Sequence, residues 1–295
     1  MPRATLPTGI EIEYETYGDE SDPTLLLVNG YTSQMLGWDV GLVERFVAQG
    51  LHVVRYDNRD VGLSTKLDGQ HVAPMKVLRR VLDGETVTDV PYTLSEMAAD
   101  GMGLLDHLGV DRAHVAGVSM GGMIVQTMAI EHPDRVASLT SIMSSIGDQR
   151  VGKPTDEARE ALLAAPPTDR DAYVENSLRV KVWASKRHFD PDAVQARAAA
   201  EFDRSFYPEG STRQLAAIYA SGDRSDRLAG LDVPTLVIHG RDDTLITPGG
   251  GERTAELIPG SRYVLLSDMG HDLPEPLWPV FAELIGGHVR VTEAA

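Results

Sequence analysis

A serine between two glycines gives the clearest chemical signal in this sequence. Ser119 stands between Gly117 and Gly121 in a G-x-S-x-G pattern, directly after a predicted strand at residues 113–118 and before a predicted helix. In this arrangement a strained turn holds the serine hydroxyl above a sheet. Side chains at positions 117 and 121 would collide with neighbouring backbone. We therefore expect Ser119 to be a nucleophile.

His271 is the predicted general base. A serine hydroxyl is a weak nucleophile at neutral pH, so it needs a base and an acid that orients this base. His271 follows Gly270 in a loop after the last predicted strand, where the chain order Ser, acid, His places the base. Other histidines have structural explanations, since His132 precedes a proline at a helix end, His107 lies on a helix and His239 lies in a predicted strand.

Two adjacent aspartates compete for the role of the acid. Asp242 and Asp243 follow the predicted strand at residues 234–239, and their side chains cannot both point at one imidazole. The spacing from Gly240 favours Asp243, which leaves Asp242 as a loop or capping residue. Asp268 is expected to be a turn residue.

Two backbone N–H groups are the predicted oxyanion hole. The N–H of Met120 opens the helix after the serine, where the helix dipole also favours an anion. The second donor is expected in the loop after residues 25–28, where Gly30 allows a bend that aims the N–H of Tyr31 inward. An ordinary turn at Asn29 and Gly30 is the alternative.

Short apolar runs separated by helical patterns must position these residues. This alternation predicts a mostly parallel sheet covered by helices. Residues 10–15 alternate between apolar and polar side chains and predict a half-exposed antiparallel strand. The runs expected to be buried strands are residues 24–28, 52–56, 113–118, 136–143, 234–239 and 261–266. Because loops collect at one edge of such a sheet, Ser119, Asp243 and His271 can converge.

Helical patterns fill the remaining chain. Thr93 and Glu96 fit a capping box before a helix over residues 94–108. Residues 75–82 have helical spacing within a long segment, and this segment can form a small cover over the sheet in addition to the cap described next. Residues 144–226 contain amphipathic helical stretches and no strand pattern, so we expect a helical cap over the carboxyl edge of the sheet. Residues 1–143 and 227–295 then form the core domain.

Composition narrows the function classes. The 295 residues carry a formal charge of −17, which disfavours nucleic acid and anionic membranes as partners. The absence of cysteine excludes disulfide scaffolds and thiolate nucleophiles. No segment has the length and apolarity of a signal peptide or a membrane span, so we expect a cytoplasmic protein. The acidic residues are too scattered for a metal site, and neither a metal nor an organic cofactor is expected.

With these residues in hand, the sequence resembles the α/β-hydrolase superfamily, in its branch with a helical cap. Beyond the serine motif, the resemblance rests on Asn29-Gly30 with Trp38, on residues 56–64, which are similar to a D-x-R-G-x-G-x-S stretch, and on the G-x-x-D loop at residues 240–248. It implies an eight-stranded, mostly parallel sheet with a cap before the penultimate strand. Asn29 replaces the family's usual histidine, which leaves Tyr31 as an expected donor because its N–H is a backbone group. Asp60 replaces a glycine, so residues 57–64 are expected to be structural.

The resemblance also implies a reaction. The chain looks most like bacterial carboxylesterases and polyketide methylesterases, so the expected partner is a small-molecule ester. A serine at position 119 argues against dehalogenase and epoxide hydrolase chemistry, which proceeds through an aspartyl ester. Hydrolysis of a carbon–carbon bond or of an enol lactone by the same triad is the alternative. A ligand receptor with vestigial hydrolase activity is the non-enzyme alternative, and the oligomeric state stays open, a homodimer included.

Substrate preference is the least determined property. Five aromatic residues of the cap either line an apolar pocket or form the core of the cap: Trp183, Phe189, Phe202, Phe206 and Tyr207. Met123, Met128 and Met143 are expected in the core. Lys186 and Arg187 form either a carboxylate site or a solvated basic turn.

Overall fold

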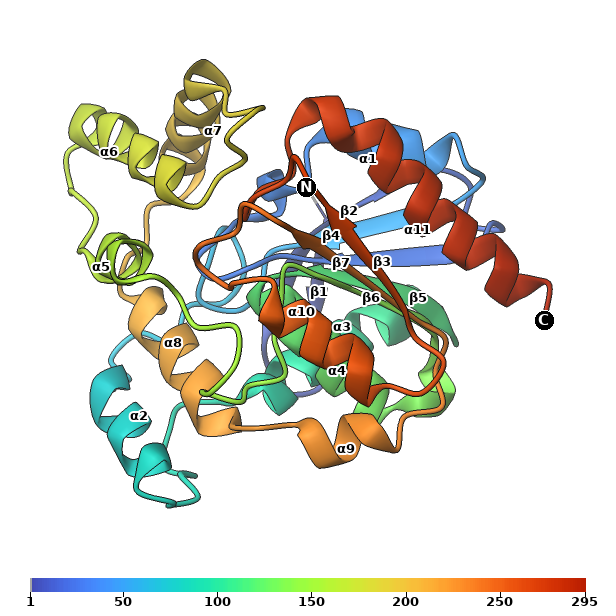
Figure 1. The fold of residues 1–295 in the computed structure, drawn as a ribbon, viewed down its shortest axis with the longest axis horizontal. Coiled ribbons are helices and arrows are strands. Elements are labelled where there is room, and N and C mark those ends of the chain that lie inside the picture. Colours follow the sequence, from blue (N-terminus) through green and yellow to red (C-terminus); the bar gives the residue numbers. More distant parts are fainter. Residues whose placement is uncertain (1) are drawn as a thin grey trace.

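The computed structural model describes residues 2–295 and contains an eight-stranded sheet (Figure 1). The strands lie in the order β1-β2-β4-β3-β5-β6-β7-β8. Neighbouring strands from β4 to β8 are parallel, whereas β2 pairs antiparallel with both β4 and β1. The predicted fold class is thereby confirmed. The strands are β1 (Arg3–Thr5), β2 (Glu11–Tyr17), β3 (Thr24–Val28), β4 (His52–Tyr56), β5 (Ala113–Val118), β6 (Val136–Ile142), β7 (Thr235–Gly240) and β8 (Arg262–Leu266).

Burial follows the position of each strand in the sheet. Strands β3, β4, β6 and β7 are buried along their whole length, as their mainly apolar runs predict. The prediction of a buried strand at residues 261–266 is wrong, because β8 is the edge strand and Leu265 is 40% exposed. The short strand β1 was not predicted at all.

Alternate residues of the central strands face two layers of helices. In β3, Leu25 and Leu27 pack with one buried cluster, and Leu26 and Val28 pack with another. The first cluster includes residues of α1 (Val40–Val47) and α11 (Trp278–Glu293), and the second includes residues of α3 (Leu94–His107) and α4 (Met120–Glu131). Helix α10 (Gly249–Leu257) lies on the same side as α3 and α4 (Figure 1). The sheet is thus a rigid central layer.

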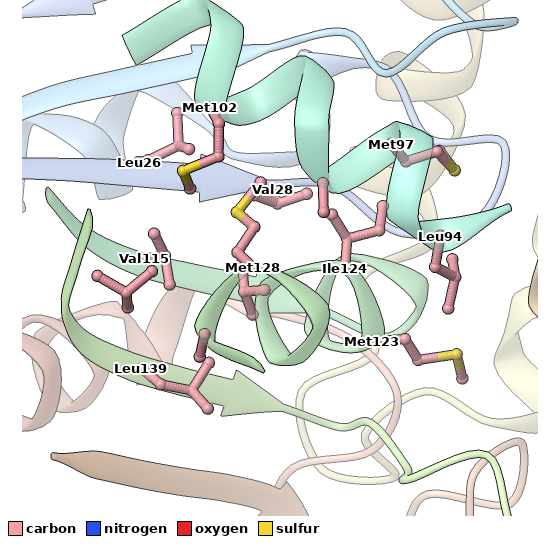
Figure 2. Close-up of a cluster of buried hydrophobic side chains, with 14 of the residues drawn as sticks. Leu26, Val28, Leu94, Met97, Met102, Val115, Met123, Ile124, Met128 and Leu139 are labelled. Carbon is pink, nitrogen blue, oxygen red and sulfur yellow. The ribbon is translucent and has the colours of Figure 1, made fainter. Parts of the chain in front are cut away.

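Helices α3 and α4 pack closely over the strands that precede the serine turn. Figure 2 shows Met128 between α3 and the strand residues Leu26 and Val115. A Cβ atom at Gly101 would overlap the end of the Met128 side chain, so this glycine leaves room for Met128. The predicted capping box is confirmed, since Thr93 Oγ1 accepts from the N–H of Ser95 and the Glu96 carboxylate accepts from the N–H of Thr93.

The chain between β6 and β7 is helical and lies at one side of the sheet (Figure 1). Its helices α5 to α8 and the 3₁₀ segment η3 form what we call the cap; the boundaries at residues 144 and 226 stay a prediction. Helix α2 (Pro74–Leu82) packs against α8 and so forms the predicted second cover. The cap elements are α5 (Asp156–Leu163), α6 (Arg170–Asn176), η3 (Ser177–Val182), α7 (Pro191–Arg204) and α8 (Gly210–Ser221), followed by α9 (Ser225–Ala229). The remaining 3₁₀ segments are η1 (Met35–Gly37), η2 (Pro133–Arg135) and η4 (Glu275–Leu277).

Two buried ion pairs join the cap to the core. Asp57 accepts from Arg204 at 2.6 Å, and Asp60 accepts from Arg213 at 2.8 Å. Asp60 has a φ of +67°, a conformation that glycine adopts readily and aspartate tolerates. Its carboxylate also accepts from the Tyr92 hydroxyl at 2.7 Å. The aspartate in place of the family's glycine therefore links the loop after β4 to helix α8.

Two observations on residues 2–295 concern membrane helices and metal ligands. No helix in this range is long and apolar enough to cross a membrane. The same residues bring together no group of three histidine, aspartate or glutamate side chains that could hold a metal ion.

Candidate active site

Ser119 lies in the sharp turn between β5 and α4. Its φ of +54° and ψ of −118° are strained for a residue with a side chain, at a cost of about 1–3 kcal/mol. The turn is tight because a Cβ atom at Gly117 would overlap the carbonyl of Gly121, and one at Gly121 would overlap the carbonyl of Val28. Only glycine fits these two positions. The turn places Ser119 on the wall of a large cavity beneath the cap.

Asp243 and His271 form a short hydrogen bond beside this cavity. His271 Nδ1 lies 2.6 Å from Asp243 Oδ2, and the carboxylate is fully buried. The other carboxylate oxygen, Oδ1, accepts from the N–H groups of Leu245 at 2.8 Å and Ile246 at 2.9 Å. Because an ionised carboxylate only accepts, His271 Nδ1 carries the proton, and its Nε2 is left as a base. His271 and Ser119 line the same cavity.

Asp243 is held in its charged form. Burial alone would raise the pKa of this carboxyl, but the charge of His271 and the hydrogen bonds from His239 and His271 outweigh burial and hold the pKa below its ordinary value. A carboxylate here stabilises the imidazolium that forms when His271 takes a proton.

The competing aspartates face elsewhere. Asp242 lies 3.3 Å from Lys186, and Asp268 lies 3.1 Å from His188 and 3.8 Å from Arg187. Each is therefore an ion-pair partner of the cap segment that carries the basic turn. The two basic residues of that turn already have carboxylate partners, which favours the structural interpretation of Lys186 and Arg187.

His239 is a second histidine on the acid, and the sequence did not reveal this contact. Its Nε2 lies 3.3 Å from Asp243 Oδ2 and 2.7 Å from the carbonyl oxygen of Ile246. A carbonyl oxygen only accepts hydrogen bonds, so His239 Nε2 carries the proton. This N–H lies within reach of the Ile246 carbonyl oxygen and of Asp243 Oδ2. The ring is fully buried, and a Cβ atom at Gly251 would lie 2.5 Å from its Nδ1. In the sequence, this contact could have been indicated by the spacing of four residues between His239 and Asp243.

The cap holds the loop that carries His271. The N–H of His271 donates to the carbonyl of Trp183 at 2.7 Å, and the N–H of Ser185 donates to Asp272 at 3.0 Å. A Cβ atom at Gly270 would overlap the backbone of Ala184. The imidazole position therefore depends on cap residues about 85 positions earlier in the chain, as the sequence separations of these bonds show.

The predicted oxyanion donors lie beside Ser119. As the first residue of α4, Met120 has no acceptor for its N–H within the helix. The loop after β3 passes next to the serine, because a Cβ atom at Gly30 would lie 3.2 Å from Ser119 Cβ. This loop, which includes Tyr31, is fixed by the cap: the N–H of Thr32 donates to Gln214 Oε1 in α8 at 2.8 Å. Gln214 was not identified from the sequence.

The cavity has a volume of about 1470 Å³, larger than most small-molecule sites. Four of the five aromatic residues considered from the sequence line it, namely Trp183, Phe202, Phe206 and Tyr207. Phe202 and Phe206 also stack at 4.6 Å, so they serve as both lining and cap core. Phe189 is not part of the lining and instead lies 5.9 Å from the Lys181 ammonium. Met128 is in the core as expected, whereas Met123 and Met143 are buried and also line the cavity.

Glu201 is a buried carboxyl in the cavity wall. Its Oε1 has no hydrogen-bond partner among residues 2–295. Burial raises the pKa of Glu201 to about 7, against a smaller opposing effect of the Arg197 charge. The folded protein therefore keeps this carboxyl protonated in a pH range where the unfolded chain ionises it.

The raised pKa of Glu201 predicts that stability falls as the pH rises from about 4.5 to about 7, because the unfolded chain loses this proton first. Glu201→Gln should remove this dependence. The unfolding free energy of the variant minus that of wild type should therefore increase by about 2–3 kcal/mol from pH 5 to pH 8. Urea denaturation at both pH values measures it. Glu209→Gln, an exposed residue of the same cavity, is the control, and equal behaviour of both variants would contradict the assignment.

Comparisons with known proteins show the family and the fold of this chain. The model of the alpha/beta hydrolase fold family matches residues 23–275. Rhodomycin D methylesterase DnrP from Streptomyces peucetius is 29% identical over 301 aligned residues, covering 94% of each chain. The enol-lactonase from Burkholderia xenovorans LB400 has a TM-score of 0.74 at 25% identity and covers 98% of this chain and 100% of its own. The meta-cleavage product hydrolase from Pseudomonas fluorescens IP01 has a TM-score of 0.77 at 18% identity, covers 100% of this chain and 98% of its own, and shows the fold alone.

Proposed function

This chain belongs to the alpha/beta hydrolase fold family, and from that premise we propose that it is a serine hydrolase that cleaves carboxylic esters through an acyl-enzyme. The observation that carries the proposal is the 2.6 Å hydrogen bond between Asp243 and His271 on the cavity that the strained Ser119 also lines. The relation to a methylesterase over 94% of the chain supports an ester as the substrate. The proposed partner is a small-molecule ester.

The proposed mechanism uses three side chains and two backbone groups. His271 Nε2 takes the proton of Ser119, and the oxygen attacks the ester carbonyl. The N–H groups of Met120 and Tyr31 stabilise the negative oxygen of the tetrahedral intermediate. The intermediate collapses, the alcohol leaves with the proton from His271, and an acyl-enzyme remains. Water then attacks the acyl-enzyme and gives one proton to His271. When this second intermediate collapses, the acid is released and His271 returns the proton to the Ser119 oxygen, which restores the free enzyme.

Hydrolysis of an enol lactone is the second candidate, favoured by the structural similarity to an enol-lactonase. A lactone is an internal ester, so the same steps apply, and the leaving alcohol stays attached to the acid. Carbon–carbon bond hydrolysis would use the same triad on a vinylogous diketone. A receptor without turnover would not need the buried Asp243 carboxylate that polarises His271.

Hydrolysis of p-nitrophenyl butyrate tests the proposed function. The purified protein should release p-nitrophenolate far faster than buffer does, and p-nitrophenyl acetate should behave alike. Release at the buffer rate, together with turnover of a vinylogous diketone, would replace ester cleavage by carbon–carbon bond hydrolysis. No turnover of either substrate would favour the receptor.

A further inference from the structure

Arg179 is a cation of the cavity wall that has no carboxylate partner. It lies in η3 and is partly buried. Its Nη1 donates to the carbonyl oxygen of Ala164 at 3.1 Å. Among residues 2–295, no carboxylate forms an ion pair with it, and the ionisable side chains that influence its pKa are Tyr173 and Tyr31, which are uncharged at neutral pH. Four of its five N–H donors are left without a described partner.

The other cations of the wall are different. Arg159 pairs with Asp156 at 2.6 Å and is exposed. Lys153 and Arg197 are exposed to water, which screens their charges. Burial costs Arg179 part of its hydration, which lowers its pKa, and no protein anion compensates for this cost. Arg179 is therefore the wall cation that has most to gain from a bound anion.

Arg179 and the oxyanion loop line the same cavity. Burial raises the pKa of the Tyr31 hydroxyl, and the positive charge of Arg179 opposes this rise, so the guanidinium lies within electrostatic range of the residue whose N–H is the proposed oxyanion donor. Tyr31 directly follows Gly30. A Cβ atom built on Gly30 would lie 3.2 Å from Ser119 Cβ, so this part of the loop passes next to the serine. A substrate whose ester carbonyl sits at Ser119 can therefore extend toward the guanidinium within the same cavity.

We propose, on the basis of the proposed function, that Arg179 binds a carboxylate of the substrate and that this hydrolase prefers esters that carry an ionised carboxyl group. A planar guanidinium offers two parallel N–H donors that match the two oxygens of a carboxylate. The formal charge of −17 repels anions from the protein as a whole, so a local unpaired cation is what such a substrate requires. Arg179 is a specificity residue and takes no part in the bond-breaking steps.

Two matched pairs of esters test the proposal, one for each end of the substrate. The mono-p-nitrophenyl ester of glutaric acid carries a carboxylate on the acyl part, and p-nitrophenyl valerate is its neutral partner. 3-(Butyryloxy)benzoate carries the carboxylate on the alcohol part, and phenyl butyrate is its neutral partner. Wild type should have a kcat/KM about 10-fold or more higher for the anionic ester of at least one pair, because a charge-assisted hydrogen bond contributes about that factor or more.

The Arg179→Gln variant should lower kcat/KM for the preferred anionic ester about 30-fold and change the neutral partner less than 3-fold. Arg179→Lys should restore part of the loss, since it keeps the charge without the planar fork. Arg159→Gln is the control, because Arg159 lines the same cavity but already pairs with Asp156; it should leave both esters unchanged. Thermal unfolding of each variant shows that the fold is retained.

The outcomes separate this inference from the proposed function. If wild type hydrolyses none of the four esters, the proposed function fails. If wild type hydrolyses the neutral esters as fast as their anionic partners in both pairs, or if Arg179→Gln lowers both members of a pair alike, the function stands and the carboxylate site at Arg179 is overturned.

Discussion

Replacing Ser119 by alanine should lower kcat for p-nitrophenyl butyrate by about 10⁵- to 10⁶-fold, the loss typical of removing the nucleophile of a serine hydrolase. The residual rate over water would come from the oxyanion donors and from binding. The fold should be retained, because alanine meets the same backbone strain as serine at a φ of +54°. Stopped-time assays at high enzyme concentration measure the residual rate.

Ser145→Ala is the matched control for this variant. Ser145 lines the same cavity but belongs to the segment after β6 and has no part in the proposed chemistry. Its kcat should stay within 3-fold of wild type. A Ser119→Ala variant that kept more than one-tenth of the wild-type rate would exclude Ser119 as the nucleophile.

Replacing Asp243 by asparagine should lower kcat by about 10⁴-fold, as expected when the imidazole is left in the wrong tautomer. An amide can donate to His271 Nδ1, and the ring proton then moves to Nε2, where the base is needed. The change keeps the side-chain volume, and an oxygen can still accept from the N–H groups of Leu245 and Ile246. Steady-state kinetics together with thermal unfolding separate the loss of activity from a loss of fold.

The neighbouring aspartate provides the control for that loss. Asp242 is adjacent in sequence but pairs with Lys186 of the cap, so Asp242→Asn should keep kcat within about 3-fold of wild type. Equal losses in the two variants would mean that the loop as a whole, rather than the carboxylate of Asp243, is required.

The parts of the fold that depend on local patterns could be predicted from the sequence. Mainly apolar runs marked the buried strands, because a strand covered on both faces has few polar positions. The glycines at positions 117 and 121 identified Ser119 as the residue of a tight turn from the sequence alone. The structure gives the physical reason, because a Cβ atom at either glycine would overlap neighbouring backbone. The capping box at Thr93 is equally local.

The parts that depend on distant partners could not be predicted. Strand β1 has three residues, too few for a periodic pattern, and it forms only by pairing with β2. The exposure of β8 follows from its edge position, which its apolar sequence does not encode. Gln214 and Arg213 contact residues more than 150 positions away, so their roles emerge only in the folded chain. The missing partner of Arg179 is likewise visible only in three dimensions.

Labelling with a fluorophosphonate tests the central claim most directly, because this reagent reacts with a serine only when a base activates it. Intact mass and peptide mapping of the folded protein should show one adduct per chain, located on Ser119, and no adduct on the same time scale in His271→Ala. Labelling of another residue, no labelling of wild type, or labelling of Ser119 at an unchanged rate in His271→Ala would contradict activation of Ser119 by His271.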